Sequence, residues 1–468
     1  MQKNDIELPN KKLPRREAFK YIALSPILAS TLLTPSISQG NTQVHDIRKK
    51  IVIVGGGAGA LMVLARLSKS IKRPNITIIS PNKTHIYQAG QVLVGAGLME
   101  YKDIFFDNKN YINEKDVTWV QDEVSLFHPK RNTVTTRKGK VVSYNYLIVA
   151  TGIQYNYEKI KGLTKKDIGT YGITSVYLND LEKGTAKGAT DTWRWFRNLK
   201  NSAKIKTPKV IFTYPNTAIK CSATPQKTLF LAADYLKQSG LEAEFEFISS
   251  QNKVFEIPKI EKTLLKEQKR YGFVKNRLQH HLESIDVEEK KAIFIHSWEE
   301  KKYNEGYRRT ELITKSERLE LDYDFIHIVP PMSSVQPLLE SDLVNKEGWL
   351  DVDKHTLQHK KYKNIFGIGD TCGVPMGKTG GSARNQGIVL TQNILDVIQN
   401  KRTSKKYDGY TVYPINTQYG KTMMAEFNYA GASPTLPLNF EKPRWIWWFS
   451  NLNISKPVYE HLMLTGKF

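Results

Sequence analysis

The chain of 468 residues is long enough for two or three domains, and its 40% hydrophobic and 25% charged residues are typical of a folded protein. Its 69 basic residues outnumber the 46 acidic ones and leave a formal charge of +23, which suits an anionic surface or a small anionic ligand. The basic residues are scattered and no nucleic-acid-binding module is visible, so we expect no nucleic acid as a partner.

Residues 1–46 have the features of a targeting segment. Arg15 and Arg16 precede a mostly apolar run at 21–33, which is too short for a spanning helix, and a polar stretch follows. This pattern is typical of twin-arginine signals, which export proteins already folded around a cofactor. We expect export to the periplasmic face of the cytoplasmic membrane, with an uncleaved anchor or a cytosolic arm as alternatives.

A strand, a glycine-rich turn and a helix are predicted next. Residues 49–54 are a β-branched run, 55–60 read Gly-Gly-Gly-Ala-Gly-Ala, and 61–67 have a helical pattern. In G-x-G-x-x-A the first glycine permits a tight turn, the second lets a pyrophosphate approach, and the alanine allows close packing of helix on strand. We therefore predict a dinucleotide site at the helix N-terminus. Its residues are Gly55, Gly57, Ala58 and Ala60.

The second strand of this unit, predicted at 75–79, departs from the usual pattern at its end. An acidic residue normally hydrogen-bonds a ribose hydroxyl there, whereas this chain has Ser80, Pro81 and Asn82. We expect Ser80 or Asn82 to offer a neutral group instead.

Two later segments complete the predicted nucleotide site. Residues 144–149 predict a buried strand that ends in Ala-Thr-Gly, and 364–368 precede Gly-Asp. Together with the glycine turn at 55–60, and in this order, these two segments resemble the FAD-binding half of flavoproteins with two dinucleotide-binding domains. Those flavoproteins are related to disulfide reductases. The resemblance implies FAD, an aspartate on its ribityl chain, and a lysine and helix N-terminus at the flavin ring. The corresponding residues are Ala150, Thr151, Gly152, Gly369, Asp370 and Lys378.

A second unit lacks the glycines of the first. Residues 209–214 predict its first strand and 228–236 its helix, with no glycine between them, so we expect no nicotinamide nucleotide there. The loop carries Cys221 instead, and Cys372, the other of only two cysteines, follows Gly-Asp-Thr. A thiol pair beside a flavin can pass two electrons from a sulfur compound to the isoalloxazine ring. Two inert buried cysteines are the alternative.

Three motifs carry a more specific resemblance. They are Tyr-Pro-Asn-Thr-Ala-Ile-Lys-Cys-Ser-Ala-Thr-Pro-Gln-Lys at 214–227, Gly-Asp-Thr-Cys-Gly-Val-Pro-Met-Gly-Lys-Thr at 369–379, and the loop that begins His-Ile-Tyr-Gln at 85–88. From about residue 49 to its C-terminus, the chain resembles the sulfide:quinone oxidoreductases, in the branch that includes the mitochondrial enzyme. The resemblance places Gln88 near the flavin.

This resemblance implies a reaction and its partners. Cys221 and Cys372 are expected to be bridged by a disulfide or trisulfide near the flavin. Hydrosulfide attacks one sulfur and leaves a persulfide, the other cysteine passes the electron pair to the flavin, and a membrane quinone reoxidises it. A small thiol or a second sulfide accepts the sulfane sulfur. Lys227 and Lys378 supply positive charge, whereas Lys220 is expected to be a solvated side chain.

Two related flavoprotein classes are alternatives. The flavin subunit of flavocytochrome c-type sulfide dehydrogenases attaches its flavin through an additional cysteine, and this chain has none to spare, so we expect non-covalent FAD. The non-pumping NADH:quinone oxidoreductases need the glycine loop that the second unit lacks. A flavoprotein that binds sulfide or polysulfide without turnover is a third alternative.

The C-terminal residues have a different character. Residues 410–424 predict a strand or hairpin near the flavin, and 444–449 read Arg-Trp-Ile-Trp-Trp-Phe. Aromatic residues among basic ones suit an amphipathic segment at a membrane surface, or else a helix pair whose tryptophans lie in the core. The family resemblance favours a membrane anchor through which quinone enters.

The predicted fold class is α/β, with two Rossmann-like, doubly wound domains of the disulfide-reductase type and a C-terminal amphipathic tail. We expect helices and surface strands, without assigned chemistry, at 164–205 and 251–315.

The histidines show no metal-ligand spacing, so we expect no metal, and whether the chain forms a homo-oligomer stays open. The segments are the targeting segment 1–46, the FAD domain 47–162 and 323–405, the second domain 163–322, and the tail 406–468.

Overall fold

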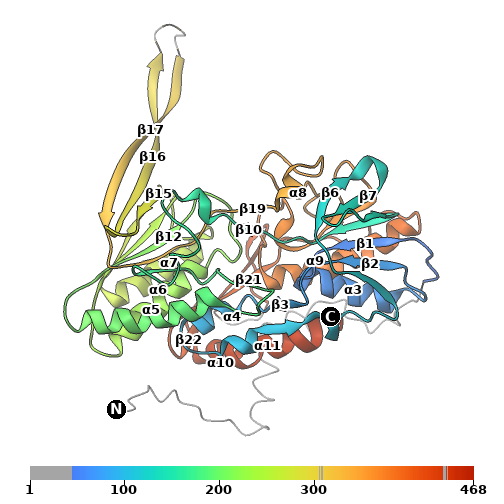
Figure 1. The fold of residues 1–468 in the computed structure, drawn as a ribbon. Coiled ribbons are helices and arrows are strands. Elements are labelled where there is room, and N and C mark those ends of the chain that lie inside the picture. The colour runs from blue at the N-terminus through green and yellow to red at the C-terminus, as the bar shows by residue number, and fades with distance from the viewer. Residues whose placement is uncertain (1–44, 305, 307–308, 436–438, 440) are drawn as a thin grey trace.

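The computed structural model describes residues 45–304, 306, 309–435, 439 and 441–468. The predicted targeting segment lies outside these residues except for its last two positions. The described chain forms two units side by side, each built on a five-stranded sheet, with C-terminal elements running along both (Figure 1). This arrangement confirms the predicted α/β class, while the residue limits of the domains stay predictions.

The first unit is built on a parallel sheet with the strand order β20-β9-β1-β2-β5. Every residue of β1 is buried, as its β-branched sequence favours in a sheet covered on both faces. Helices α3 and α9 pack with this sheet in one hydrophobic core. The elements are β1 (Ile51–Val54), α3 (Ala58–Ser70), β2 (Ile76–Ile79), β5 (Val117–Val120), β9 (Tyr146–Val149), β20 (Ile365–Gly367) and α9 (Gly380–Ile398).

The second unit has the parallel order β11-β18-β12-β13-β14 and confirms the predicted strand and helix around Cys221. Helix α6 begins four residues earlier than predicted, at Thr224, because Pro225 fits the first turn, where its missing N–H is not needed. The elements are β11 (Ile173–Thr174), α5 (Lys187–Ala203), β12 (Lys209–Tyr214), α6 (Thr224–Lys237), β13 (Glu244–Ser249), α7 (Pro258–Tyr271), β14 (Val274–Arg277) and β18 (Phe325–His327).

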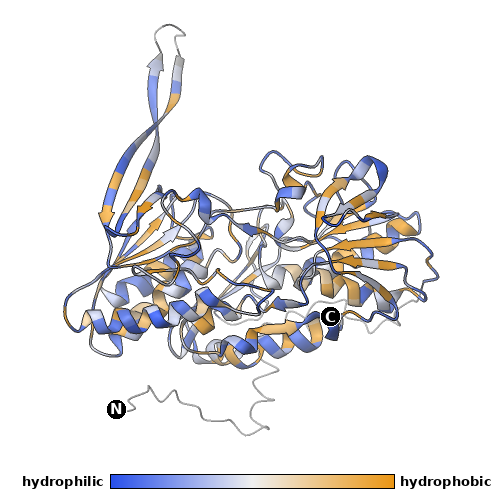
Figure 2. Cartoon of the chain, in the orientation of Figure 1, coloured by the Kyte–Doolittle hydropathy of each residue, from blue (hydrophilic) through white to orange (hydrophobic). Residues whose placement is uncertain are grey.

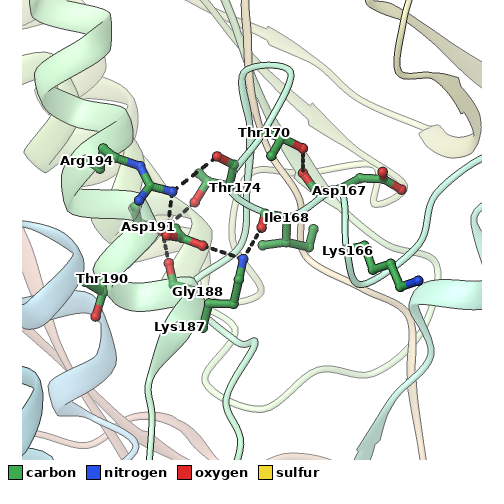
Figure 3. Close-up of polar contacts among 12 residues, drawn as sticks. Lys166, Asp167, Ile168, Thr170, Thr174, Lys187, Gly188, Thr190, Asp191 and Arg194 are labelled. Carbon is green, nitrogen blue, oxygen red and sulfur yellow. Dashed lines mark hydrogen bonds and ion pairs between the residues drawn. The ribbon is translucent and has the colours of Figure 1, made fainter.

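The buried Asp191 carboxylate on α5 takes part in a network of polar contacts that connects this helix to the loop at 168–169. Asp191 lies 2.7 Å from both the Lys187 ammonium and the Arg194 guanidinium, and these two cations also donate to the carbonyls of Ile168 and Gly169 (Figure 3). A cavity of about 400 Å³ adjoins this contact, and its lining contains none of the predicted site residues. We therefore assign these ion pairs to the stability of the second unit.

A β-hairpin projects from the second unit (Figure 1). Strands β15 (His280–Asp286), β16 (Lys291–Asn304) and β17 (Arg309–Asp322) form an antiparallel sheet, but β15 pairs with β16 only as far as His296. Beyond that residue, β16 and β17 pair with each other alone. In Figure 2 the strands of the two central sheets are mainly hydrophobic, whereas the distal hairpin is largely hydrophilic.

The C-terminal elements join the two units. The predicted hairpin, β21 (Thr411–Gln418) and β22 (Lys421–Asn428), packs into the core of the second unit. Helices α10 (Trp445–Asn453) and α11 (Ser455–Val458) follow, and the π-helical turn Tyr459–Met463 reaches the core of the first unit. No helix of the described residues is long and apolar enough to cross a membrane.

The three tryptophans of α10 have different surroundings. Trp447 is fully buried and Trp448 nearly so, whereas Trp445 is 47% exposed. Two of them therefore lie in the core, as one of the two interpretations of this segment predicted.

Shorter elements complete the fold. The pairing of β10 with β19 links the two connections between the units. These elements are β3 (Thr84–Ile86), α4 (Gly90–Gly95), β4 (Phe105–Asp107), β6 (Val124–His128), β7 (Thr133–Thr136), β8 (Val141–Ser143), β10 (Gln154–Tyr155), β19 (Met332–Ser333), α8 (Gln336–Leu339) and β23 (Gly431–Ala432).

Candidate active site

The glycines after β1 leave the N-terminus of α3 open to a ligand. Gly57 is the N-cap residue and provides no side-chain cap, and no atom would lie within 4 Å of a Cβ added to it. Gly55 has a φ of +123°, and a Cβ there would lie 2.2 Å from the carbonyl oxygen of Ala150. Ala60 is fully buried in the core between helix and sheet. The uncapped N–H groups from Ala58 onward suit a pyrophosphate.

Neutral polar groups surround this turn where an acidic residue is usual. A Cβ added to Gly56 would lie 2.1 Å from the Ser80 hydroxyl oxygen and 3.4 Å from the Asn108 amide nitrogen. The Asn108 amide donates to the Asn82 carbonyl at 3.0 Å, and its oxygen lies 2.6 Å from His85 Nδ1. Ser80 therefore stays the predicted ribose contact, beside Asn108, which the sequence pattern did not identify.

The second part of the predicted FAD site is equally open. Gly152 and Gly369 have φ values of +68° and +80°, and no atom would lie within 4 Å of a Cβ at either. The Thr151 hydroxyl donates to the Thr371 hydroxyl at 3.1 Å and joins the two segments. The Gly369 N–H donates to the Gln386 side-chain oxygen at 2.8 Å. The open space beside these two glycines fits a bound cofactor.

Cys221 is held in a strained backbone position against the segment that follows Cys372. Its φ is +50°, which costs a non-glycine residue about 1 kcal/mol or more. Its N–H donates to the Lys378 carbonyl oxygen at 2.8 Å, and its carbonyl accepts from the Thr224 N–H at 2.8 Å. Lys227 Nζ lies 3.5 Å from Cys221 Sγ. The half-buried sulfur thus lies at the N-terminus of α6 beside a cation, and both features stabilise a thiolate.

The Cys372 thiol lies deeper than the Cys221 thiol. It is fully buried in an apolar cluster that includes Leu350, Val352 and Ile365. Burial raises the pKa of Cys372 to about 12, so the thiol is protonated there. Both cysteines are free thiols. The structure therefore brings the two loops together but leaves the two sulfurs apart, without the expected bridge.

Lys378 is tied to the Cys372 loop. Its ammonium donates to the carbonyls of Asp370 at 2.6 Å and Cys372 at 3.1 Å, and it lies 3.6 Å from the centre of the Trp349 ring. Burial lowers the pKa of Lys378 to about 8. Burial also raises the pKa of Asp370, although Lys378 and Lys220 act in the opposite direction. The predicted Asp370 and Lys378 therefore belong to one compact loop directly after β20.

Lys220 is not a solvated side chain, and our expectation for it was wrong. It is 4% exposed, and its ammonium donates to the side-chain oxygens of Gln88 at 2.6 Å and Gln91 at 3.3 Å. It lies over the rings of Tyr155 and Tyr177, at 4.8 and 5.4 Å from their centres. Burial lowers its pKa to about 8. Its position beside a cysteine is the sequence signal that could have identified it.

These residues form a consistent set. An open cradle for a dinucleotide lies in the first unit, and the second unit presents a thiol whose surroundings are cationic. Such a site can bind FAD and attract an anionic sulfur compound to the same place.

Comparisons with known proteins agree with this arrangement. Residues 49–186 match the family model of pyridine nucleotide-disulphide oxidoreductases. The mitochondrial sulfide:quinone oxidoreductase of Dictyostelium discoideum is 35% identical over 424 residues, which cover 90% of this chain and 86% of that protein. The corresponding protein of Mus musculus is 33% identical over 422 residues, covering 89% of this chain and 86% of its own length.

A solved structure shares the fold. The sulfide:quinone oxidoreductase of the hyperthermophilic bacterium Aquifex aeolicus has a TM-score of 0.68 with this chain and is 19% identical to it. The match covers 89% of this chain and 92% of that one.

The glycine cradle leads to a prediction with an internal control. We expect Gly57→Ala to weaken FAD binding at least about tenfold, or 1.4 kcal/mol, because the new methyl group occupies space that only a ligand fills. The free energy of unfolding of the apoprotein should change by less than about 1 kcal/mol. Fluorescence titration with FAD and urea unfolding measure the two quantities.

Gly55→Ala is the matched variant. It should destabilise the apoprotein, because its methyl group would meet the Ala150 carbonyl and its φ is unfavourable for alanine. Equal effects of the two variants on folding would contradict the assignment of Gly57 to ligand binding.

Proposed function

The chain belongs to the sulfide:quinone oxidoreductase family, and from this we propose how its own residues carry out the FAD-dependent oxidation of sulfide with a quinone as electron acceptor. The proposal rests mainly on the loop after β12. In a nucleotide-binding unit this loop would contain glycines, whereas here it presents Cys221 to the segment around Lys378. The second unit therefore serves sulfur chemistry and binds no nicotinamide.

The sulfur step uses the two cysteines as one unit. Hydrosulfide attacks one sulfur of a Cys221–Cys372 disulfide, a new S–S bond forms, the old one breaks, and its electron pair leaves on the other cysteine as a thiolate. Bound FAD supplies a two-electron acceptor that the quinone reoxidises. A small thiol or a second sulfide then removes the sulfane sulfur from the persulfide. The Lys227 ammonium stabilises negative charge on Cys221 whenever this cysteine is the released thiolate.

The bridged state requires a change in the Cys372 loop. Its sulfur must turn out of the apolar cluster toward Cys221. Gly369 and Gly377 flank this loop with φ values of +80° and +105°, and glycines at these places allow the backbone to rearrange at low cost.

We propose that FAD binds without a covalent bond. The residues around the cradle are glycines, alanine, serine and threonine, and both cysteines have a role in the sulfur step. Denaturation by acid or heat should release all flavin into the supernatant. Flavin fluorescence that migrates with the denatured chain would overturn this proposal.

We also propose an exported, membrane-associated protein that acts at the periplasmic face. The supporting features are the arginine pair and apolar run at 15–33, together with the exposed Trp445, which stacks on Phe449 at 5.4 Å. Cell fractionation with a fusion to residues 1–46, and flotation of the purified protein with anionic lipid vesicles, test the two parts. A cytosolic fusion would refute export, and a protein that stays below the vesicles would refute membrane association.

A further prediction concerns the electron donor. Anaerobic sulfide should bleach the flavin absorbance within the turnover time, whereas NADH should not, because the second unit has no glycine loop for a pyrophosphate. Stopped-flow absorbance near the flavin maximum measures both rates. Rapid bleaching by NADH would place the chain with the NADH:quinone oxidoreductases instead.

Another prediction concerns the two cysteines. Cys221→Ser and Cys372→Ala should each abolish sulfide-dependent quinone reduction while FAD stays bound, because residues that act as a unit fail together. Alanine is chosen at Cys372 because a hydroxyl would be buried among aliphatic side chains. Bound flavin and thermal unfolding serve as controls. If both variants kept more than about a tenth of wild-type turnover, a loss below about 1.4 kcal/mol, the cysteine mechanism would be wrong.

A further inference from the structure

A cluster of polar side chains lies on one side of Cys221 and has no part in the chemistry described so far. Ser222 follows the cysteine, Tyr214 ends β12, Tyr413 lies on β21, and Glu256 lies in the loop between β13 and α7. The Ser222 hydroxyl lies 3.4 Å from a Glu256 carboxylate oxygen and 3.1 Å from the Tyr413 hydroxyl. Side chains from two distant parts of the chain, Glu256 and Tyr413, thus contact the residue next to the reactive thiol.

The Glu256 carboxyl group differs from the other groups in this cluster. Among the described residues it forms no ion pair, and the nearby Lys253 ammonium donates to the backbone carbonyl of Glu256 at 3.1 Å. Burial raises its pKa, with Ser222 and Lys253 acting in the opposite direction. The side chain is partly exposed, so a proton on it can exchange with solvent. These are the properties of a general base.

The charged and titratable groups that face Glu256 cannot replace it in that role. Tyr214 and Tyr413 have pKa values raised by burial and by the charges of Glu256 and Cys221, so both keep their protons. Lys227 on α6 carries a positive charge and already contacts Cys221. Lys253 is also a cation. Glu256 is therefore the carboxyl group of this cluster that is available to accept a proton.

We propose that Glu256 takes the proton from a neutral sulfur nucleophile, hydrogen sulfide or a small thiol, that enters beside Cys221. The S–H bond breaks and its proton moves to the carboxylate, directly or through Ser222. The resulting sulfur anion attacks the disulfide or persulfide, one S–S bond forms and another breaks, and the electron pair leaves on the released cysteine. Glu256 then passes the proton to solvent. This inference rests on the proposed sulfur chemistry at Cys221.

The test compares the pH dependence of turnover in the wild-type holoenzyme and Glu256→Gln. Two arms separate the sources of the proton: sulfide alone, and sulfide with 2-mercaptoethanol as acceptor. At a pH about two units below the pKa of the nucleophile used in each arm, we expect Glu256→Gln to be slower by about 10²-fold in at least one arm. About one unit above that pKa the nucleophile is already ionised, and the variant should recover to within about threefold.

Three further variants complete the design. Glu242→Gln removes an exposed carboxylate of the same unit and should leave both profiles unchanged. Ser222→Ala should show a smaller loss with the same pH dependence, and Glu256→Asp should keep the wild-type profile at reduced rate. Flavin content and thermal unfolding monitor the fold.

The outcomes separate this inference from the proposed function. A Glu256→Gln loss that is uniform across pH, or no loss, would overturn the role of Glu256 while leaving the sulfide reaction intact. A wild-type holoenzyme that fails to reduce quinone with sulfide would overturn the proposed function itself.

Discussion

One backbone hydrogen bond, from the Cys221 N–H to the Lys378 carbonyl oxygen, joins the two halves of the site. Cys221 follows β12, the central strand of the second sheet, and Lys378 precedes α9, which packs with the first sheet. The bond therefore fixes where the sulfur stands relative to the cradle. Cys221 makes this bond from a left-handed backbone conformation, and contacts such as that of Lys220 with Gln88 offset the strain.

Buried positive charge explains why this loop suits anionic sulfur. Lys220 and Lys378 have pKa values lowered by burial to about 8, and neither forms an ion pair among the described residues. Below that pH both are cations in a region of low dielectric, and the buried Asp370 carboxyl group is the charge that acts on both of them. A thiolate or hydrosulfide near these lysines adds a second compensating charge. Selectivity thus follows from where these lysines lie rather than from the formal charge of +23.

Local patterns were predictable from the sequence, and distant contacts were not. The strand, glycine turn and helix at Gly55–Gly57 follow from residues adjacent in the chain, as does the absence of a glycine loop near Cys221. The burial of Lys220 depends on Gln88 and on aromatic rings from other segments, so no local pattern contains it. The depth of Cys372 likewise depends on the packing of Leu350 against β20. Glu256 lies 35 positions from Cys221 in a stretch of ordinary composition.

The unequal depth of the two sulfurs determines which one an oxidant damages. Peroxide converts an accessible thiolate to sulfenic acid and then irreversibly to sulfinic and sulfonic acids, in proportion to its exposure and ionisation. Cys372 is protected by its apolar surroundings, whereas the half-buried Cys221 is open to attack. A bridged or persulfidated Cys221 has no free thiolate to oxidise. Inactivation by peroxide should therefore be fastest when both cysteines are reduced and slowest when they are bridged.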